Sequence, residues 1–184
     1  MVLRHSGFTL LELLVVISIS AILVALGSGY IDDTINRMSA KQKVSEIQLL
    51  LSKARATALF SNTKVTLCPL TSQQQCGNNW NEELSLFTDP NHNRILDSNE
   101  TILQRFPPSK NKHTLRHFNN LAAGFDGQGF ASYNAGSFSY CYKNKSTLGA
   151  IFIISRIGRV RFAMTTDANN LPTTPSGNPI PCPN

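Results

Sequence analysis

The first third of the chain carries two apolar patterns, a continuous run and then a helical repeat. Residues 8–26 read FTLLELLVVISISAILVAL and contain one ionisable side chain, Glu12. A bilayer span needs about 20 mainly apolar helical residues, so this run predicts that residues 8–30 form the transmembrane half of a helix. Between residues 31 and 60 the apolar positions recur at helical spacing, which predicts an amphipathic continuation of the helix. These positions are Ile31, Ile35, Met38, Val44, Ile47, Leu51, Ala54 and Ala58.

Beyond residue 61 the pattern changes to short runs rich in β-branched and aromatic residues, separated by Gly, Asn and Pro. Such runs between turn residues are typical of strands. They predict an α+β fold in which the long N-terminal helix packs against an antiparallel β-sheet domain, residues 61–166. The tail, residues 167–184, is rich in Pro and Asn and has little apolar surface to bury. The expected strands are 64–67, 84–88, 101–106, 138–142, 149–155 and 159–164.

A short basic segment, residues 1–7, precedes the apolar run. A secretory signal has a shorter apolar stretch followed by its cleavage site, so cleavage is expected here before the helix. Arg4 favours the cytoplasm for this end, which places the residues after Tyr30 on the outer side of the membrane. A carboxylate in hydrocarbon is costly unless it is protonated or paired, and we therefore expect Glu12 to have a positively charged partner.

Length and charge narrow the class of protein. With 184 residues, 41% of them hydrophobic, the chain is long enough for one globular domain plus an appendage. Its 17 Lys and Arg residues against 11 Asp and Glu give a formal charge of +6, which favours phosphates, anionic lipid or acidic proteins as partners. The sequence has no GxSxG elbow, HExxH pair or phosphate-cradling glycine loop, so it offers no catalytic site and no cofactor.

The four cysteines are not spaced as a zinc site or a thioredoxin-like site. In an oxidising compartment two disulfides are expected, and three pairings are open. We favour the pairing in which Cys68 and Cys76 close a short polar loop. Cys141 and Cys182 would then tie the tail to the domain.

Residues 6–23, SGFTLLELLVVISISAIL, resemble the signature of type IV prepilins, a Gly-Phe junction followed by TLLEL and an apolar helix. The resemblance implies a type IV pilin fold, cleavage after Gly7 by prepilin peptidase and N-methylation of Phe8. It also implies that Glu12 acts in assembly by pairing with the Phe8 amine of a neighbouring subunit. The chain would first be a single-pass inner-membrane protein with its C-terminal domain in the periplasm, and later part of an extracellular pilus. The alternative is a plain membrane anchor whose Glu12 reaches the interface.

The polar loop 89–100 has the ligand spacing of an EF-hand calcium loop. Its sixth position, which requires Gly, is however Arg94, and its flanks have the pattern of strands. We favour a hairpin loop in which Asp and Asn side chains bond to their own backbone in Asx turns. Similar loops are familiar in minor pilins of the GspH/FimT type. The matching positions 1, 3, 5, 9 and 12 are Asp89, Asn91, Asn93, Asp97 and Glu100.

A basic GRVR stretch follows the predicted strand 149–155. Gly158 supplies a turn, and strand alternation then places Arg159 and Arg161 on one face and Val160 and Phe162 on the other. Paired guanidinium groups suit the phosphates of a DNA backbone. The stretch also resembles the GRxR motif of FimT-like minor pilins, in which these arginines bind DNA for uptake in natural transformation. An exposed edge hairpin whose charges block aggregation is the alternative.

Further basic residues would widen such a surface if they fold near the arginine pair. His113 and His117 would suit a metal ion only on a helix, and the surrounding segment has the pattern of a loop. The residues expected to contribute to the DNA surface beside the arginine pair are Arg156, Lys143 and Lys145. Other positive charge lies in Lys110, Lys112, His113, Arg116 and His117.

The resemblances imply one of two functions, neither of them enzymatic. The main hypothesis is a minor pilin of the GspH/FimT family that binds double-stranded DNA without sequence specificity for uptake in natural transformation. The alternative is a structural minor pilin or type II secretion pseudopilin, similar to FimU and GspH. Such a protein primes assembly or sits at the filament tip without binding DNA.

Overall fold

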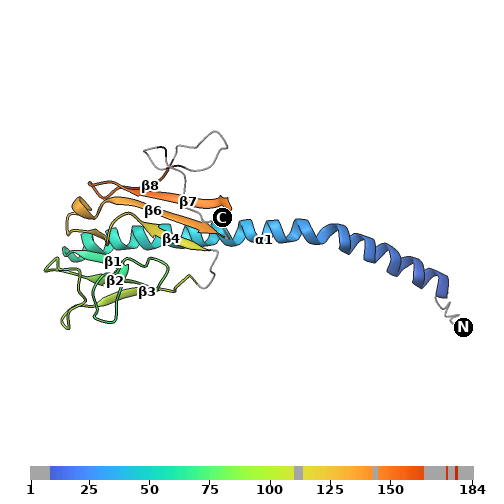
Figure 1. Cartoon of the computed structure of the whole chain (residues 1–184), viewed down its shortest axis with the longest axis horizontal. Helices are drawn as coiled ribbons and strands as arrows, with labels where there is room; N and C mark the ends of the chain where they lie inside the picture. The colour runs from blue at the N-terminus through green and yellow to red at the C-terminus, as the bar shows by residue number, and fades with distance from the viewer. Residues whose placement is uncertain (1–8, 110–113, 143–144, 164–172, 174–176, 178–184) are drawn as a thin grey trace, which may run out of the picture. The chain divides into compact units, whose positions relative to one another are not determined.

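A long helix and two antiparallel sheets make up the described part of the chain (Figure 1). The computed structural model describes residues 9–109, 114–142, 145–163, 173 and 177. The helix, α1, spans Leu10–Ser61. The chain forms two compact units, Met1–Ser39 and Ala40–Asn184.

In the first unit, α1 begins with a capped turn and continues with an exposed apolar surface. Thr9 Oγ1 accepts the backbone N–H of Glu12 at 3.2 Å, the hydrogen bond of an N-terminal helix cap. The hydroxyls of Ser18 and Ser20 donate to carbonyls four residues earlier. The large apolar side chains between residues 10 and 24 are 49–77% exposed. Among the described residues, no helix has the length and apolar character required to cross a membrane.

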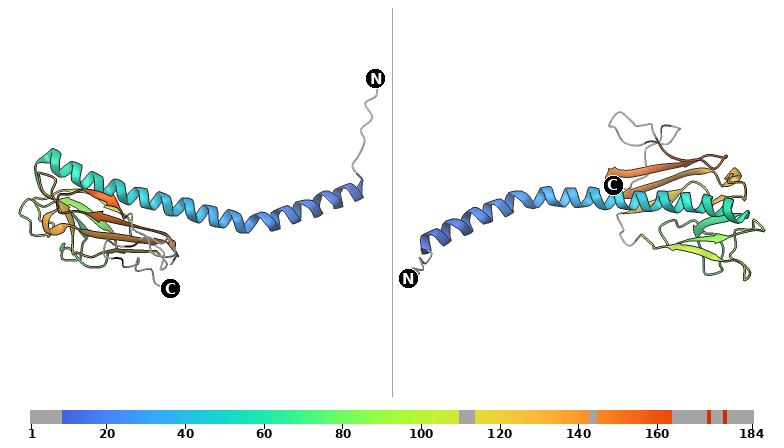
Figure 2. Two further views of the ribbon diagram at one scale, coloured as in Figure 1. Left: turned by 90° about the horizontal axis from the view of Figure 1, so that it is seen from above. Right: turned by 180° about the vertical axis from the view of Figure 1, so that it is seen from behind.

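The second unit packs the C-terminal part of α1 on two four-stranded sheets. Figure 1 shows the sheets along this part of the helix, and Figure 2 shows the helix lying across them. The strand orders are β3-β2-β1-β5 and β4-β6-β7-β8, with antiparallel neighbours throughout. A 3₁₀ turn, η1 (Ser132–Asn134), precedes β6. The strands are β1 (Val65–Pro69), β2 (Leu84–Thr88), β3 (Ile102–Phe106), β4 (Leu115–Phe118), β5 (Ala123–Phe125), β6 (Gly136–Tyr142), β7 (Lys145–Ile154) and β8 (Val160–Phe162).

An apolar core lies between α1 and both sheets. Trp80 is buried in it and packs edge to face against Phe118 of β4 and Phe138 of β6, with ring centroids 5.1 and 5.6 Å apart. Each buried Leu, Ile or Phe side chain contributes about 1.5–3 kcal/mol. The sheets therefore cannot separate from the helix without a large loss of stability. The buried residues of α1 in this core are Ile47, Leu50, Leu51, Ala54 and Ala58.

The buried stripe of α1 is shorter than the apolar repeat predicts. Ile35 and Met38 belong to that repeat but are exposed, because the second unit begins only at Ala40. Leu50, which the predicted stripe leaves out, is buried instead. Helical spacing indicates which side of a helix is apolar, but the position of the partner sheets decides where burial begins.

The sequence pattern misses two strands, β4 and β5. β4 lies in a segment predicted to be a loop, because its residues, LRHF, include two basic side chains. β5 has three residues, AGF, and is too short to show an alternating pattern. His117 is exposed on β4, so the helical spacing that a His113–His117 metal site would need is absent; His113 lies outside the described residues.

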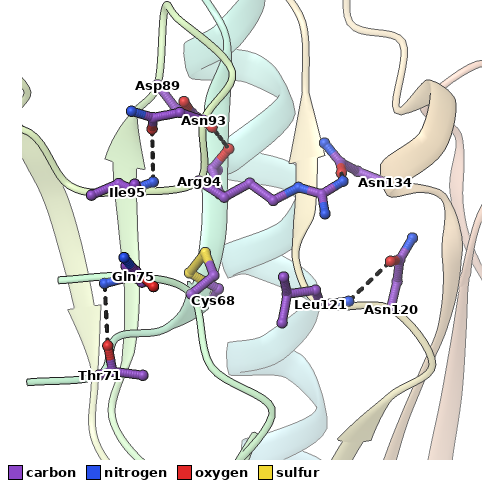
Figure 3. Close-up of a disulfide and its surroundings, with 12 residues drawn as sticks. Cys68, Thr71, Gln75, Asp89, Asn93, Arg94, Ile95, Asn120, Leu121 and Asn134 are labelled. Atoms are coloured by element: carbon purple, nitrogen blue, oxygen red, sulfur yellow. Dashed lines mark hydrogen bonds between the residues drawn. A yellow bond between two sulfur atoms is a disulfide. The ribbon is translucent and has the colours of Figure 1, made fainter. Parts of the chain in front are cut away.

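A disulfide joins Cys68 of β1 to Cys76, as the sequence predicts, with Cα atoms 5.5 Å apart (Figure 3). Beside it, the N–H of Cys76 donates to the carbonyl of Arg94 at 3.0 Å, which connects the short loop to the polar loop after β2. Cys141 is disulfide-bonded as well. Its expected partner, Cys182, lies outside the described residues.

Candidate functional site

Residues 155–161, the arginine turn, lead from β7 into β8 and carry three arginines, Arg156, Arg159 and Arg161. The shape of this turn depends on Gly158. This residue has φ +76°, and a Cβ added to it would lie 1.8 Å from the carbonyl oxygen of Gly129. Ser155 closes the turn, since its N–H donates to the Arg159 carbonyl and its Oγ accepts the Arg159 N–H, both at 3.0 Å. From α1, Arg55 Nε donates to the same Gly129 oxygen at 3.2 Å. The turn is therefore held closely against the rest of the domain.

The predicted alternation of side chains along β8 is found only in part, because Phe162 is 41% exposed although it lies on the same face as Val160. Val160 packs against the core, and Phe162 stacks on Phe152 of β7 with ring centroids 4.7 Å apart. Because side chains alternate across a strand, Arg159 and Arg161 face outward together. Both arginines are exposed.

The other predicted basic residues are only partly brought to this turn. Arg156 is exposed within it. Lys145 begins β7, whereas the turn follows the other end of the strand at Ile154. The two ends are nine positions apart, which is about 30 Å along an extended strand. Lys143 and residues 110–113 lie outside the described residues. Within the part of the chain that is described, Arg156 and the outward-facing pair have no acidic side chain at ion-pair distance.

Arg116, which the sequence groups with the surface charges, is a buried structural residue. Its Nη2 donates to the carbonyls of Asn81 and Glu82 at 2.9 and 2.8 Å, and its Nη1 donates to the carbonyl of Pro107 at 3.1 Å. The guanidinium group lies 5.2 Å from the ring centre of Phe106. Burial lowers the pKa of Arg116 to about 10. This side chain fastens two loops to β4 and is not part of a basic surface.

The polar loop 89–100 is built from Asx turns. Asn91 Oδ1 accepts the N–H of Asn93 at 3.1 Å. Asn93 Oδ1 accepts the N–H of Ile95 at 2.8 Å (Figure 3). Both amide nitrogens donate to Asp97 Oδ2 at 2.8 Å. These are the hydrogen bonds that the hairpin-loop interpretation predicts. Across the described ranges, no three His, Cys, Asp or Glu side chains are placed to share a metal ion.

The carboxylates at the two ends of the loop differ in burial, since Asp89 is buried and Glu100 is half-buried. Asp89 is fully buried; its Oδ2 accepts the Thr66 hydroxyl at 2.6 Å and lies 3.7 Å from Lys64 Nζ. Glu100 Oε2 accepts the N–H of Asp97 at 3.1 Å. Burial raises the pKa of Glu100, and the Asp89 and Asp97 charges add to that effect. Because Asp89 is fully buried and bound to Thr66, it holds this end of the loop against the domain.

Arg94 is a residue whose role the sequence does not reveal. It has φ +61°, the left-handed conformation that Gly usually adopts. Its Nη2 donates to Asn134 Oδ1 at 3.0 Å, so the loop after β2 is joined to η1 (Figure 3). The two residues are 40 positions apart. The sequence gives one indication of the special conformation of Arg94, which is that this residue occupies the position where a calcium loop requires glycine.

The N-terminal motif is only partly described. Gly7 and Phe8 lie outside the described residues. Glu12 is exposed in the first turn of α1, where the helix dipole favours a negative charge.

The long helix packed on antiparallel sheets is a type IV pilin-like α+β fold. Residues 43–158 match the family described as type II transport protein GspH, and residues 3–28 match the prokaryotic N-terminal methylation motif. The chain therefore belongs to the GspH family of pilin-like proteins, which are structural subunits and not enzymes.

A solved structure is similar to this chain in fold. The crystal structure of the type IV minor pilin FimU of Pseudomonas aeruginosa is similar with a TM-score of 0.52 and 18% identity, over 68% of this chain and 89% of FimU. A second crystal structure of FimU, in another space group, has a TM-score of 0.49 and 17% identity, over 66% of this chain and 90% of FimU. At this identity the likeness concerns the fold alone. No curated protein matches the sequence.

Proposed function

We propose that this protein is a structural minor pilin or pseudopilin. It is anchored in the inner membrane by the start of α1 and is then assembled with other pilins into a type IV pilus or a type II secretion pseudopilus. The observation that carries the proposal is the apolar surface of α1 between residues 10 and 24, whose large side chains are mostly exposed. Leaving one such side chain in water forgoes about 1.5–3 kcal/mol, so lipid or a neighbouring helix is the environment that suits this surface.

Processing would prepare the helix for assembly. Prepilin peptidase would cleave after Gly7 and methylate the amine of Phe8, a role that the methylation motif over residues 3–28 supports. Glu12 of one subunit would then pair with the Phe8 amine of its neighbour. In an apolar filament core this pairing offsets the cost of burying the carboxylate.

A strain that lacks the gene tests the proposal, with Glu12→Gln as the informative variant. The deletion should abolish pili or type II secretion, and mass spectrometry of the wild type should find a methylated Phe8 as the first residue. Glu12→Gln should be processed but fail to enter filaments. Glu82→Gln, which removes an acid outside α1, is the matched control. Normal filaments and normal secretion in the deletion strain would refute the proposal.

Binding of double-stranded DNA is a second candidate function, and the arginine turn favours it. Arg159 and Arg161 face outward from one side of a hairpin, and Arg156 is exposed beside them. Guanidinium groups make charge-assisted contacts to phosphates without reading the bases. The rigid turn at Gly158 would hold the pair in position for such contacts.

A duplex-binding assay on the full-length chain in non-ionic detergent tests this second function. Arg159→Gln with Arg161→Gln should weaken binding and reduce the slope of log affinity against log salt by about 1.8, because each lost phosphate contact contributes about 0.9. The matched control is Lys53→Gln with Arg105→Gln, which removes two charges next to β3. If both double variants lose the same affinity, only net charge matters and the arginine turn is not a DNA site.

A further inference from the structure

A pocket of about 380 Å³ lies beside the arginine turn. It is bounded by the loop that follows β2 and by the segment that leads from β5 through η1, all within the second compact unit. Its wall combines basic side chains with two aromatic rings and one acid. These residues are Lys64, His92, Arg94, Asp126, Phe130 and Tyr133.

The backbone around the pocket is strained. Three non-glycine residues that line it, His92, Arg94 and Ser132, have φ of +63°, +61° and +47°. An L-residue in this conformation costs about 1–2 kcal/mol, and such residues concentrate at functional sites. Elsewhere in the described chain, only Asn62 and Gln74 share the conformation among non-glycine residues. The strain is thus concentrated at this pocket.

Two cations, Lys64 and Arg94, and two acids, Asp89 and Asp126, lie at or next to the inner wall of the pocket. Burial lowers the pKa of Lys64, and the nearby charge of Arg94 adds to that lowering while Asp89 opposes it. The Asp89 carboxylate is 3.7 Å from Lys64 Nζ and already accepts a hydroxyl. The acid of the pocket itself, Asp126, accepts two backbone N–H groups of its own turn. Of the two cations, Arg94 is the one without a carboxylate at ion-pair distance among the described residues, so a bound anion would pair with Arg94.

Arg94 is held ready for such an anion. Its Nη2 is fixed by Asn134, which is itself buried. Within the described residues, its guanidinium group makes no second hydrogen bond. The remaining N–H groups of this planar group are therefore available to phosphate oxygens, and holding the side chain in place in advance reduces the entropy lost on binding.

Aromatic rings stand at the mouth of the same pocket. Tyr133 is 91% exposed and Phe130 is 42% exposed. Rings so exposed add little to the core, but they offer flat surfaces on which an unpaired base can stack whatever its sequence. Basic groups inside and aromatic rings at the rim are the combination found in sites for single-stranded nucleic acid.

The pocket is joined to the arginine turn by hydrogen bonds. The carbonyl of Arg156 accepts the N–H of Ala131 at 3.0 Å and the N–H of Ser132 at 2.9 Å. One wall of the pocket is therefore built directly on the turn. A strand bound at one of these features would pass close to the other.

We propose that this pocket binds a phosphate group of single-stranded DNA and that the ring of Tyr133 stacks on an adjacent unpaired base. The proposal rests on the DNA binding proposed above and adds to it a second site and a strand preference. In a duplex the bases are stacked on one another and are not free to reach Tyr133. The protein therefore binds a single strand more tightly than a duplex of equal length.

Fluorescence anisotropy of the full-length chain in non-ionic detergent tests this site, with a labelled oligothymidylate and a duplex of the same length as probes. Tyr133→Ala should lower affinity for the single strand about fivefold or more and leave duplex affinity unchanged. Phe60→Ala is the matched control, because this ring is 95% exposed at the end of α1 and does not line the pocket. It should bind both probes like the wild type.

A charge variant tests the phosphate contact separately. Arg94→Gln should weaken single-strand binding and reduce its salt dependence, whereas Arg94→Lys should recover part of the affinity. Arg105→Gln, which removes one charge on β3, should bind like the wild type. Thermal unfolding of each variant verifies that the fold is kept.

The outcomes separate the two sites. If Tyr133→Ala and Arg94→Gln bind the single strand as the wild type does, the pocket proposal is overturned, while duplex binding through Arg159 and Arg161 can still stand on its own assay. If the pocket variants lose affinity and the Arg159/Arg161 double variant does not, the pocket is supported and the turn is rejected as the DNA site. A wild type that binds neither probe overturns both proposals.

Discussion

Replacing Gly158 by Ala tests the packing that holds the arginine turn. An L-residue at φ +76° costs about 1–2 kcal/mol. The added Cβ would lie 1.8 Å from Gly129 O, where ordinary contact begins at 3.4 Å, so the two backbones must separate by the difference. That movement would also disrupt the hydrogen bond from Arg55 to Gly129 O, a charged bond that contributes about 1.5–3 kcal/mol. We therefore expect a total loss of about 2.5–5 kcal/mol in the free energy of unfolding.

Urea unfolding of the full-length chain, followed by tryptophan fluorescence, measures this loss. Trp80 is the one tryptophan in the sequence and is buried in the core that both sheets share. Gly177→Ala is the matched control, since Gly177 has φ +81° but nothing within 4 Å of an added Cβ. The control should lose no more than the conformational cost of about 1–2 kcal/mol. If Gly158→Ala is as stable as Gly177→Ala, the close approach to Gly129 does not constrain the turn.

Three further predictions concern stability and use the same assay. Arg116→Ala should cost about 3–5 kcal/mol, because it leaves buried carbonyls without their charged donor; a cost below 1 kcal/mol would mean that Arg116 is solvated. Since burial raises the pKa of Glu100 above its ordinary 4.5, the stability from this group is present below that pH and is lost as pH rises through the raised pKa. Glu100→Gln should therefore be more stable than the wild type at about pH 7 but not at about pH 4, and equal stability at both would contradict the burial of this carboxyl. Replacing Cys68 and Cys76 together by Ser should cost about 2.5 kcal/mol, the loop-closure value for a separation of eight residues, whereas no change would show that the loop is ordered without the bond.

Local features of the chain were readable without a structure because their signals lie within a few residues. The apolar repeat of α1, the strands β1, β2 and β6 and the fold class follow from periodicity, which is a property of neighbouring positions. The Cys68–Cys76 pair closes so short a loop that it was the natural choice among the pairings. The Asx turns of the loop 89–100 follow from the tendency of Asn side chains to bond to nearby backbone.

Local sequence patterns could not predict which basic side chains are buried. Arg116 and Lys145 have the same sign of charge, yet Arg116 is enclosed by carbonyls from two loops and Lys145 lies at the end of β7 far from the turn. The sequence contains no signal for this difference, because the partners of Arg116 come from segments up to 35 residues away. The sequence pattern also misses β4, because Arg116 occupies a buried position of this strand and interrupts its hydrophobic alternation.

The class of this protein could be read from local sequence patterns: an apolar N-terminal helix with one carboxylate, a methylation motif, and an antiparallel domain behind them. Only the folded domain reveals which distant residues share a surface. Arg94 and Asn134 are brought together across 40 residues, and the turn of Arg156 supports the wall of their pocket. Such a site depends on long-range sheet packing and on strained backbone that packing can hold. Short-range patterns in a sequence carry no record of either.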